Sequence, residues 1–380
     1  MTSDRDHGDV TITKVETIPL KLPLAKPTKI SQGAARQNVE VLIVRLHTNT
    51  SIVGIGETQA WRRQGNAETL PSLVTQIRDH FALHLIGRSP FDSASILRNL
   101  DAAIYRSMYA QAPVADALCD LQARLLGVPV YKLLGGKCRT SLTAGCLIYM
   151  KSSLEETVES AEEFYDQGFR SFTLKVGVDL ADDIRNAKAL RDRFSDRIIL
   201  RVDANAGMDF DSALKLVKHI EPYDIDAAEQ LLPLWDVDGM ADLARHTHIP
   251  MMTDECVATD HDLIGVIRKR AATVVQTKIA KNGGMWRCLN LWRLADAAGM
   301  RIYPGNHPST SVATIAATHV AAAWPGSLLD GAFACGIGAI VEDIVTEPVC
   351  LDKAAVLVPD KPGLGVELDE ERIKKWRVDV

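Results

Sequence analysis

The sequence predicts a (β/α)8 barrel of the TIM type, with a modified outline, preceded by a separate α+β domain. Two observations carry this prediction. Between residues 139 and 348, short apolar runs alternate with amphipathic helical patterns. These runs are continuously apolar, which is typical of parallel strands buried on both faces. Eight such strands alternating with helices over roughly 200 residues indicate this kind of barrel.

The α+β domain is expected at residues 10–138. Three strand-like stretches predict an antiparallel sheet, and three amphipathic segments after them predict helices. The expected strands are 10–22, 38–49 and 51–57, and the expected helices are 70–85, 91–107 and 112–127. Residues 1–9, MTSDRDHGD, are polar and are expected to form a disordered tail.

Within residues 139–348, each expected strand is followed by a helix until the eighth strand. The strands are 142–150, 171–177, 198–207, 225–231, 250–256, 274–280, 301–307 and 327–333, and the helices are 153–168, 181–194, 210–223, 237–247, 260–270, 283–299 and 311–324. Residues 349–380 are turn-rich and then polar, and they are too few to fold alone. We expect this segment to pack back on the α+β domain and complete it.

Composition excludes several classes of protein. The chain has 380 residues and a net charge of −6, which gives no basic surface for nucleic acid. No apolar run is long enough to cross a membrane, and the start has no apolar signal core. Seven scattered cysteines without a C-x-x-C pair argue against disulfides and a zinc site, and they favour the cytoplasm.

Charged residues recur at intervals of about one βα unit along the predicted barrel. Glu229 follows Asp203 by 26 residues, Asp254 follows after 25 more, and Lys278 after a further 24. Lys175 precedes Asp203 by 28 residues. If Lys175 lies at the carboxyl end of its strand, all five lie at the barrel mouth, where barrel enzymes keep their active sites.

Three carboxylates at one point repel each other, by about 4 kcal/mol for a pair 4 Å apart at an effective dielectric of 20. A divalent cation removes this cost, and all-oxygen ligands favour Mg²⁺, with Mn²⁺ as an alternative. We therefore predict one ion per subunit, bound by Asp203, Glu229 and Asp254. For any one of these acids alone, a helix cap or a salt bridge is the simpler interpretation.

Two lysines flank the predicted ion on opposite sides of the barrel. A cation and a neighbouring ammonium would lower the pKa of Lys175 and of Lys278, so that either could act as a general base. Such a pair could remove a proton from one face of a bound carbon and return one to the other. The alternative is that each lysine only neutralises the carboxylates.

The chain resembles the enolase superfamily, in particular the mandelate racemase and muconate-lactonizing enzyme family and most of all its muconate-lactonizing branch. The resemblance covers nearly the whole chain. It rests on GIGET, LIGRSPFD and GVPVYKLLGG in the first domain, on VDAN, AEQ, TDE and KIAKNGG in the barrel, and on PDKPGLGVELD near the end. The first domain then corresponds to the capping domain of the family.

The resemblance implies Mg²⁺ on the three acids and acid–base roles for Lys175 and Lys278. It implies that Asn205 and Glu255 orient these groups. The racemase branch uses a histidine on the seventh strand with an aspartate on the sixth; here His307 follows the seventh strand, but the sixth carries a lysine. His307 is therefore either a substrate contact or a loop residue.

One departure from the family concerns the second strand, where Lys-x-Lys is usual and this chain has Thr173 in the first position. Thr173 would suit a smaller or less anionic substrate group. Two capping-domain loops, residues 24–36 and 58–66, are expected to select the substrate, the second through Trp61, Arg62 and Arg63, with a solvated loop as the alternative. Asp330 is expected at the end of the eighth strand, where it could face a cationic group.

The implied reaction is removal of the proton alpha to the carboxylate of a small substrate, through an enediolate. The predicted enzyme is an isomerase: a cycloisomerase, a racemase or an epimerase. A dehydratase of acid sugars or hydroxy acids is the alternative within the superfamily. A Schiff-base aldolase using Lys278 and a barrel that only binds are alternatives of other classes. Relatives usually form dimers or larger even-numbered rings, so a homo-oligomer, a dimer or an octamer, is expected.

Overall fold

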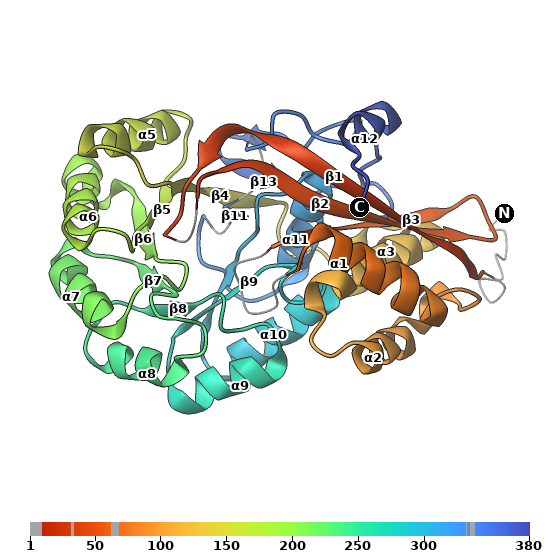
Figure 1. Cartoon of the computed structure of the whole chain (residues 1–380), viewed down its shortest axis with the longest axis horizontal. Helices are drawn as coiled ribbons and strands as arrows, with labels where there is room; N and C mark the ends of the chain where they lie inside the picture. Colours follow the sequence, from red (N-terminus) through yellow and green to blue (C-terminus); the bar gives the residue numbers. More distant parts are fainter. Residues whose placement is uncertain (1–9, 32–33, 62–67, 332, 335–338) are drawn as a thin grey trace.

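The computed structural model of the chain describes residues 10–31, 34–61, 68–331, 333–334 and 339–380. An antiparallel sheet with helices comes first, and a barrel of parallel strands follows (Figure 1). This confirms the predicted fold class. The limits proposed for the domains stay predictions.

The first domain contains a three-stranded sheet in the order β1-β2-β3, with both pairs antiparallel. Its elements are β1 (Ile12–Thr28), β2 (Arg36–Thr48), β3 (Val53–Gln59), α1 (Leu70–Thr75), a π-helical turn (Gln76–Phe81), α2 (Ser93–Ala103), α3 (Met108–Leu126) and α4 (Val130–Leu134). Short 3-10 turns lie at Ala82–His84 and Pro90–Asp92.

Two glycines in the GIGET motif let α3 pack directly on β3. A Cβ atom on Gly54 would lie 2.2 Å from the Ala117 carbonyl oxygen, and one on Gly56 would lie 2.1 Å from that of Pro113. Both distances are too short for any side chain. Close contact between this strand and this helix therefore requires glycine at both positions.

The barrel strands are parallel neighbours in sequence order. They are β4 (Ser141–Ile148), β5 (Ser171–Lys175), β6 (Ile199–Asp203), β7 (Ala227–Glu229), β8 (Met251–Thr253), β9 (Val274–Thr277), β10 (Arg301–Pro304) and β11 (Phe333–Ala334). β11 pairs in parallel with β4, and the Leu329 amide donates to the Ile302 carbonyl of β10, 2.9 Å away. The segment from Leu329 to β11 thus connects the seventh strand to the first and closes the barrel.

Helices surround the barrel on its outside (Figure 1). They are α5 (Leu154–Asp166), α6 (Leu180–Phe194), α7 (Phe210–Ile220), α8 (Val237–Arg245), α9 (Asp260–Lys269), α10 (Met285–Ala297) and α11 (Ser311–Ala323), with 3-10 turns at Ser195–Arg197 and Glu221–Tyr223. Every residue of α11 is buried, because this helix lies between the barrel and the first domain. A helix that is covered on all sides carries apolar and small residues all round.

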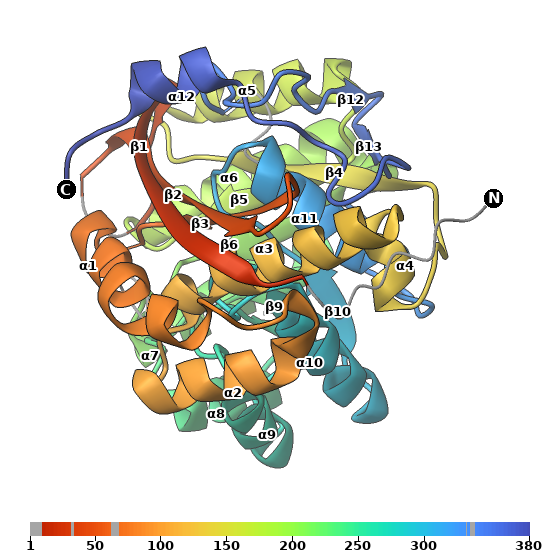
Figure 2. The same cartoon turned by 90° about the vertical axis from the view of Figure 1, so that its right-hand side faces the viewer.

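The chain end returns to the first domain, as Figure 2 shows for α12 (Glu370–Trp376) beside β1. The ring of Trp376 donates to Glu342, and Arg124 of α3 pairs with Glu367 at 2.7 Å. Before it, β12 (Leu351–Asp352) and β13 (Ala355–Leu357) form a small antiparallel extension on β4. Among the described residues, no helix has the length and apolar character needed to span a membrane.

Candidate active site

Five charged residues occupy the carboxyl ends of five consecutive strands. Lys175, Asp203 and Glu229 are the last residues of β5, β6 and β7, and they are direct partners in the strand register. Asp254 and Lys278 immediately follow β8 and β9. We call these five residues the barrel mouth; all are at most 7 % exposed. Since β5 and β9 are four strands apart in a barrel of eight, the two lysines approach from opposite sides.

On one side, Lys175 binds the Asp203 carboxylate directly, and its ammonium also donates to Asn205 Oδ1 at 3.0 Å. The Asn205 backbone has φ +46°, which lets its own amide donate to Asp203 Oδ1 at 2.7 Å. Its side-chain amide donates to Glu255 Oε1 at 3.2 Å. Asn205 therefore links Asp203, Lys175 and Glu255, as expected of a residue that orients the others.

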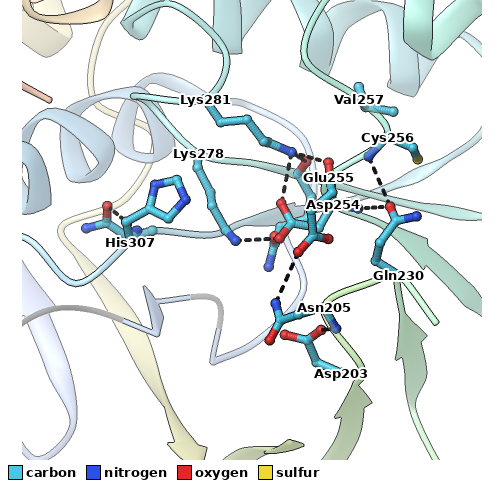
Figure 3. Close-up of polar contacts among 12 residues, drawn as sticks. Asp203, Asn205, Gln230, Asp254, Glu255, Cys256, Val257, Lys278, Lys281 and His307 are labelled. Atoms are coloured by element: carbon cyan, nitrogen blue, oxygen red, sulfur yellow. Dashed lines mark hydrogen bonds and ion pairs between the residues drawn. The ribbon is translucent and has the colours of Figure 1, made fainter. Parts of the chain in front are cut away.

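On the other side, Asp254 receives two ammonium groups. Lys278 Nζ donates to Asp254 Oδ2, and Lys281 Nζ lies 3.0 Å from Asp254 Oδ1 (Figure 3). The Gln230 side-chain oxygen accepts the backbone amides of Asp254 and Cys256, each at 3.1 Å. This fixes the turn after β8, and with it the direction of the Asp254 carboxylate.

Among the described residues, carboxylates outnumber lysines at and directly beside the barrel mouth. Four buried carboxylates face three ammonium groups; they are Asp203, Glu229, Asp254 and Glu255 against Lys175, Lys278 and Lys281. Burial first, and then the charges of Asp203 and Asp254, raise the pKa of Glu229 well above its usual value. Burial and the same two neighbours raise the pKa of Glu255 to about 8. A further cation would relieve this excess of negative charge.

The donor types fit a hard divalent cation, since Asp203, Glu229 and Asp254 offer only oxygen. Within the described residues, however, no three acid, histidine or cysteine side chains are arranged to hold one ion together. Lys175 and Lys278 instead contact Asp203 and Asp254 themselves. The shared ion at these three acids therefore stays a prediction.

The expected lowering of both lysine pKa values is not found. Burial alone would lower the pKa of Lys278, but the charges of Asp254, Glu229 and Glu255 outweigh it and raise the pKa. Burial is likewise outweighed at Lys175, whose pKa is raised by Asp203 and Glu229. Each ammonium lies directly on a carboxylate here. The lowering of both pKa values that is expected with a bound cation stays a prediction.

A small cavity of about 50 Å³ opens above the lysines. Its charged lining residues are Arg36, Lys175 and Lys278, and the rest of the lining is Thr28, Ile30, Trp61, Leu147, Tyr149, Asn205, Asn306, His307 and Pro308. The Arg36 guanidinium stacks 3.7 Å from the centre of the Trp61 ring. With three cations and no acid on its described lining, this cavity suits an anionic ligand.

His307 lies at this cavity, 4.4 Å from Trp61 and 5.9 Å from Tyr109 between ring centres. Neither of its ring nitrogens has a hydrogen-bond partner in the described part of the chain. Burial, and then the nearby charge of Lys278, lower its pKa well below the usual value, so the imidazole is neutral. Figure 3 shows it beyond Lys278, on the side away from Asp254.

Other predicted residues lie elsewhere or are not described. Thr173 is buried inside the barrel, where its side chain hydrogen-bonds Tyr303, and it is not among the residues that line the cavity. The position expected for Asp330 was wrong, because β11 begins only at Phe333. The Asp330 carbonyl accepts from Ser171 at the start of β5, at the opposite end of the barrel from the mouth. Arg62 and Arg63 lie outside the described residues.

Three residues of the site were missed from the sequence. Lys281 could have been found from the second lysine of KIAKNGG, and Gln230 from its place directly after Glu229 in AEQ. Arg36 is the last residue of the first loop expected to select the substrate, residues 24–36, but it was not singled out there, because a basic residue at the start of a strand is usually solvated.

Two family models match the chain. One, described as "Enolase C-terminal domain-like", matches residues 156–372, and the other, the mandelate racemase / muconate lactonizing enzyme N-terminal domain, matches residues 12–135. The chain belongs to the mandelate racemase/muconate lactonizing enzyme family of the enolase superfamily. The predicted resemblance is thereby confirmed, and the first domain is the capping domain of this family.

Relatives of this family match nearly end to end. The chain is 31 % identical to muconate cycloisomerase 1 of Rhodococcus opacus, over 97 % of this chain and 99 % of the relative. The structure of N-succinyl Arg/Lys racemase from Bacillus cereus superposes with a TM-score of 0.91 at 28 % identity, covering 97 % and 98 %. Muconate lactonizing enzyme from Pseudomonas fluorescens, complexed with muconolactone, gives 0.90 at 29 % identity, covering 97 % and 99 %.

Proposed function

We propose that this protein is a Mg²⁺-dependent isomerase that removes the proton alpha to the carboxylate of a small substrate. The single observation that carries the proposal is the register at the barrel mouth, which sets three acids between two lysines on five consecutive strands. The relatives named above are a cycloisomerase, a racemase and a lactonizing enzyme, which all fall within this reaction class.

Asp203, Glu229 and Asp254 would hold the cation, with Asn205 and Gln230 keeping the two aspartates in place. The ion, when bound, would neutralise the acids, lower the pKa of both lysines and stabilise negative charge on the substrate carboxylate.

Lys175 and Lys278 would then exchange protons with the substrate carbon through their Nζ atoms. One lysine takes the alpha proton from one face, and the electron pair moves onto the carboxylate to give an enediolate. A proton returned from the opposite lysine gives racemisation or epimerisation. In cycloisomerisation, ring closure of a diene acid forms the enediolate, and a lysine then protonates its alpha carbon. In dehydration, the enediolate loses a beta hydroxyl, which takes a proton from a lysine and leaves as water.

The test is a screen of carboxylic acids, including acyl amino acids and muconates, in D₂O with Mg²⁺, followed by NMR. We expect at least one acid to gain deuterium at the alpha carbon, and EDTA to stop the exchange. Intact exchange in both Asp203→Asn and Lys278→Ala would refute the proposed site. A borohydride-trapped adduct of a keto acid on Lys278 would instead support an aldolase.

The six cysteines that the structure describes are free, which agrees with a reducing compartment such as the cytoplasm. A small carboxylate is the proposed partner, with neither nucleic acid nor membrane, and the protein is proposed to form a homo-oligomer, a dimer or an octamer. Light scattering of the purified protein would test the assembly.

A further inference from the structure

The capping domain contacts the barrel beside the active site through a buried carboxylate, Glu57. This carboxylate has no part in the proposed chemistry. Glu57 stands near the end of β3 and is 1 % exposed. Its carboxylate accepts the backbone amides of Thr310 and Ala313, at 3.0 and 2.9 Å, and the Thr310 hydroxyl at 2.5 Å. Gln59 of the same strand donates a fourth hydrogen bond, at 2.9 Å.

Three of the four donors belong to the amino end of α11, whose N-cap is Thr310. Unpaired amides and the helix dipole make this end favourable for a negative charge. Here the charge comes from the other domain, from a residue 253 positions earlier in the chain. Glu57 therefore fastens the barrel loop that precedes α11 to the edge of the capping sheet.

That loop, residues 305–310, carries His307 and Asn306 into the cavity lining. The capping domain contacts this loop at two points. Glu57 binds Thr310, and Trp61, four residues after Glu57, packs against the His307 ring with the ring centres 4.4 Å apart. His307 makes no ring hydrogen bond among the described residues that could hold it in place. Its orientation thus depends on how the loop is held at Thr310 and on the Trp61 ring.

We propose that Glu57 is a positioning residue that sets His307 against Trp61 and so shapes the substrate-facing wall of the cavity. The effect on substrate binding rests on the proposed function. The placement of His307 by Glu57 is independent of that function. A carboxylate is needed, because its two oxygens accept four donors. A glutamine has only one acceptor oxygen, and its NH₂ group would face the amide donors.

The chain offers a matched control at the same helix end. Asp343 accepts the Ser311 amide and hydroxyl, at 3.0 and 2.7 Å, and it belongs to the barrel side of the chain. Asp343→Asn therefore disturbs the same α11 terminus without touching the contact between the domains. If Glu57 served only as a helix cap, the two substitutions would act alike on His307.

The experiment records ¹H–¹³C spectra of protein with labelled histidine, with the His307 signals assigned from His307→Ala. In the native protein these signals should be displaced by the ring currents of Trp61 and Tyr109. Glu57→Gln should move them toward the values of an exposed histidine, and Thr310→Ala should move them partway, while Asp343→Asn should leave them unchanged. Equal shifts in Glu57→Gln and Asp343→Asn, or no shift in Glu57→Gln, would overturn the proposal.

If Glu57→Gln does not fold, Thr310→Ala still tests the proposal. It removes the hydroxyl, which donates to Glu57 and accepts the Val312 amide at 3.2 Å, and it leaves Glu57 with its two backbone amide donors. An unchanged His307 signal in Thr310→Ala would then overturn the proposal. With a substrate from the deuterium screen, Glu57→Gln should raise KM severalfold and change kcat less, because the lysines stay in place. If the screen finds no substrate, the spectra still decide the placement of His307, so the two failures can be told apart.

Discussion

Two regions of this molecule bury carboxylates, and the carboxylates have different hydrogen-bond partners in the two regions. At the barrel mouth, the aspartates contact the ammonium groups of lysine side chains. At what we call the domain border, formed by Glu57, Asp116 and Asp120, the acids accept backbone amides from segments far away in the chain.

The two kinds of hydrogen-bond partner suit two different roles, catalysis at the barrel mouth and packing of the domains at the domain border. An acid that accepts fixed main-chain amides ties elements together, since its partners cannot move without unfolding. An acid held by lysines can exchange them for an ion or a substrate. Substitutions at the mouth should therefore change activity more than stability, and those at the border should do the reverse.

The largest effect should be the loss of exchange in Lys278→Ala. Removing a general base slows proton transfer by about 10²–10⁴-fold. The fold should survive, because Lys281 stays within 3.0 Å of Asp254. The rate of alpha deuteration measures the effect, with circular dichroism to check folding. Lys269→Ala, which removes an exposed lysine paired with Asp238, is the control and should keep the native rate.

Next in size is the loss of stability in Asp120→Ala. Asp120 is fully buried, binds Arg124, and accepts the amides of Ile55 and Leu364, at 2.9 and 2.6 Å. Breaking such a buried pair costs about 3–5 kcal/mol of the free energy of unfolding, which denaturant titration would measure. Glu367→Ala removes the exposed partner of the same arginine and should cost less than about 1 kcal/mol. Equal losses of stability in Asp120→Ala and Glu367→Ala would contradict the role given to the buried acids of the domain border.

Glu229→Gln should separate stability from metal binding. Because folding raises the pKa of Glu229, its ionised form opposes folding above the usual carboxyl range, so the metal-free variant should be at least as stable as the native protein. Native protein should gain about 3 kcal/mol from Mg²⁺ at a hundredfold excess over Kd, and the variant much less. Thermal unfolding with EDTA and with Mg²⁺ measures both. An undiminished Mg²⁺ effect in Glu229→Gln would contradict the ligand assignment.

The smallest expected effect, for each unit of pH, is a change in the pH dependence of stability at Asp116. Burial first, and then Glu57 and Asp120, raise the pKa of Asp116 to about 8, while its Oδ1 accepts the Met285 amide at 2.8 Å. The folded protein therefore keeps a proton that the unfolded chain releases above about pH 4, and stability falls as the pH rises toward 8.

Asp116→Asn keeps the acceptor oxygen and removes the titration. Relative to the native protein, its free energy of unfolding should rise by about 1.4 kcal/mol for each pH unit between pH 5 and pH 8. Denaturant titrations at the two pH values measure this. A constant difference between them would mean that Asp116 does not titrate in this range.

The positions at the barrel mouth could be predicted because the βα unit repeats, so intervals of 24 to 28 residues return the chain to the same end of the barrel. The same periodicity misled for Asp330, since SLLDGAF has the composition of a strand although β11 begins only at its last residue. Thr173 lies two residues before Lys175, which places it one layer deeper in the barrel, away from the mouth. The contact between Glu57 and Thr310 joins residues 253 positions apart, and no local pattern indicates it.

The most direct test of the account is a crystal structure of the protein with Mn²⁺, with the ion located by its anomalous scattering. We predict one ion bound by Asp203, Glu229 and Asp254, with the Lys175 and Lys278 ammonium groups moved off Asp203 and Asp254 and facing each other across the cavity. An ion bound elsewhere, or three acids that still point at their lysines with no ion between them, would contradict the account.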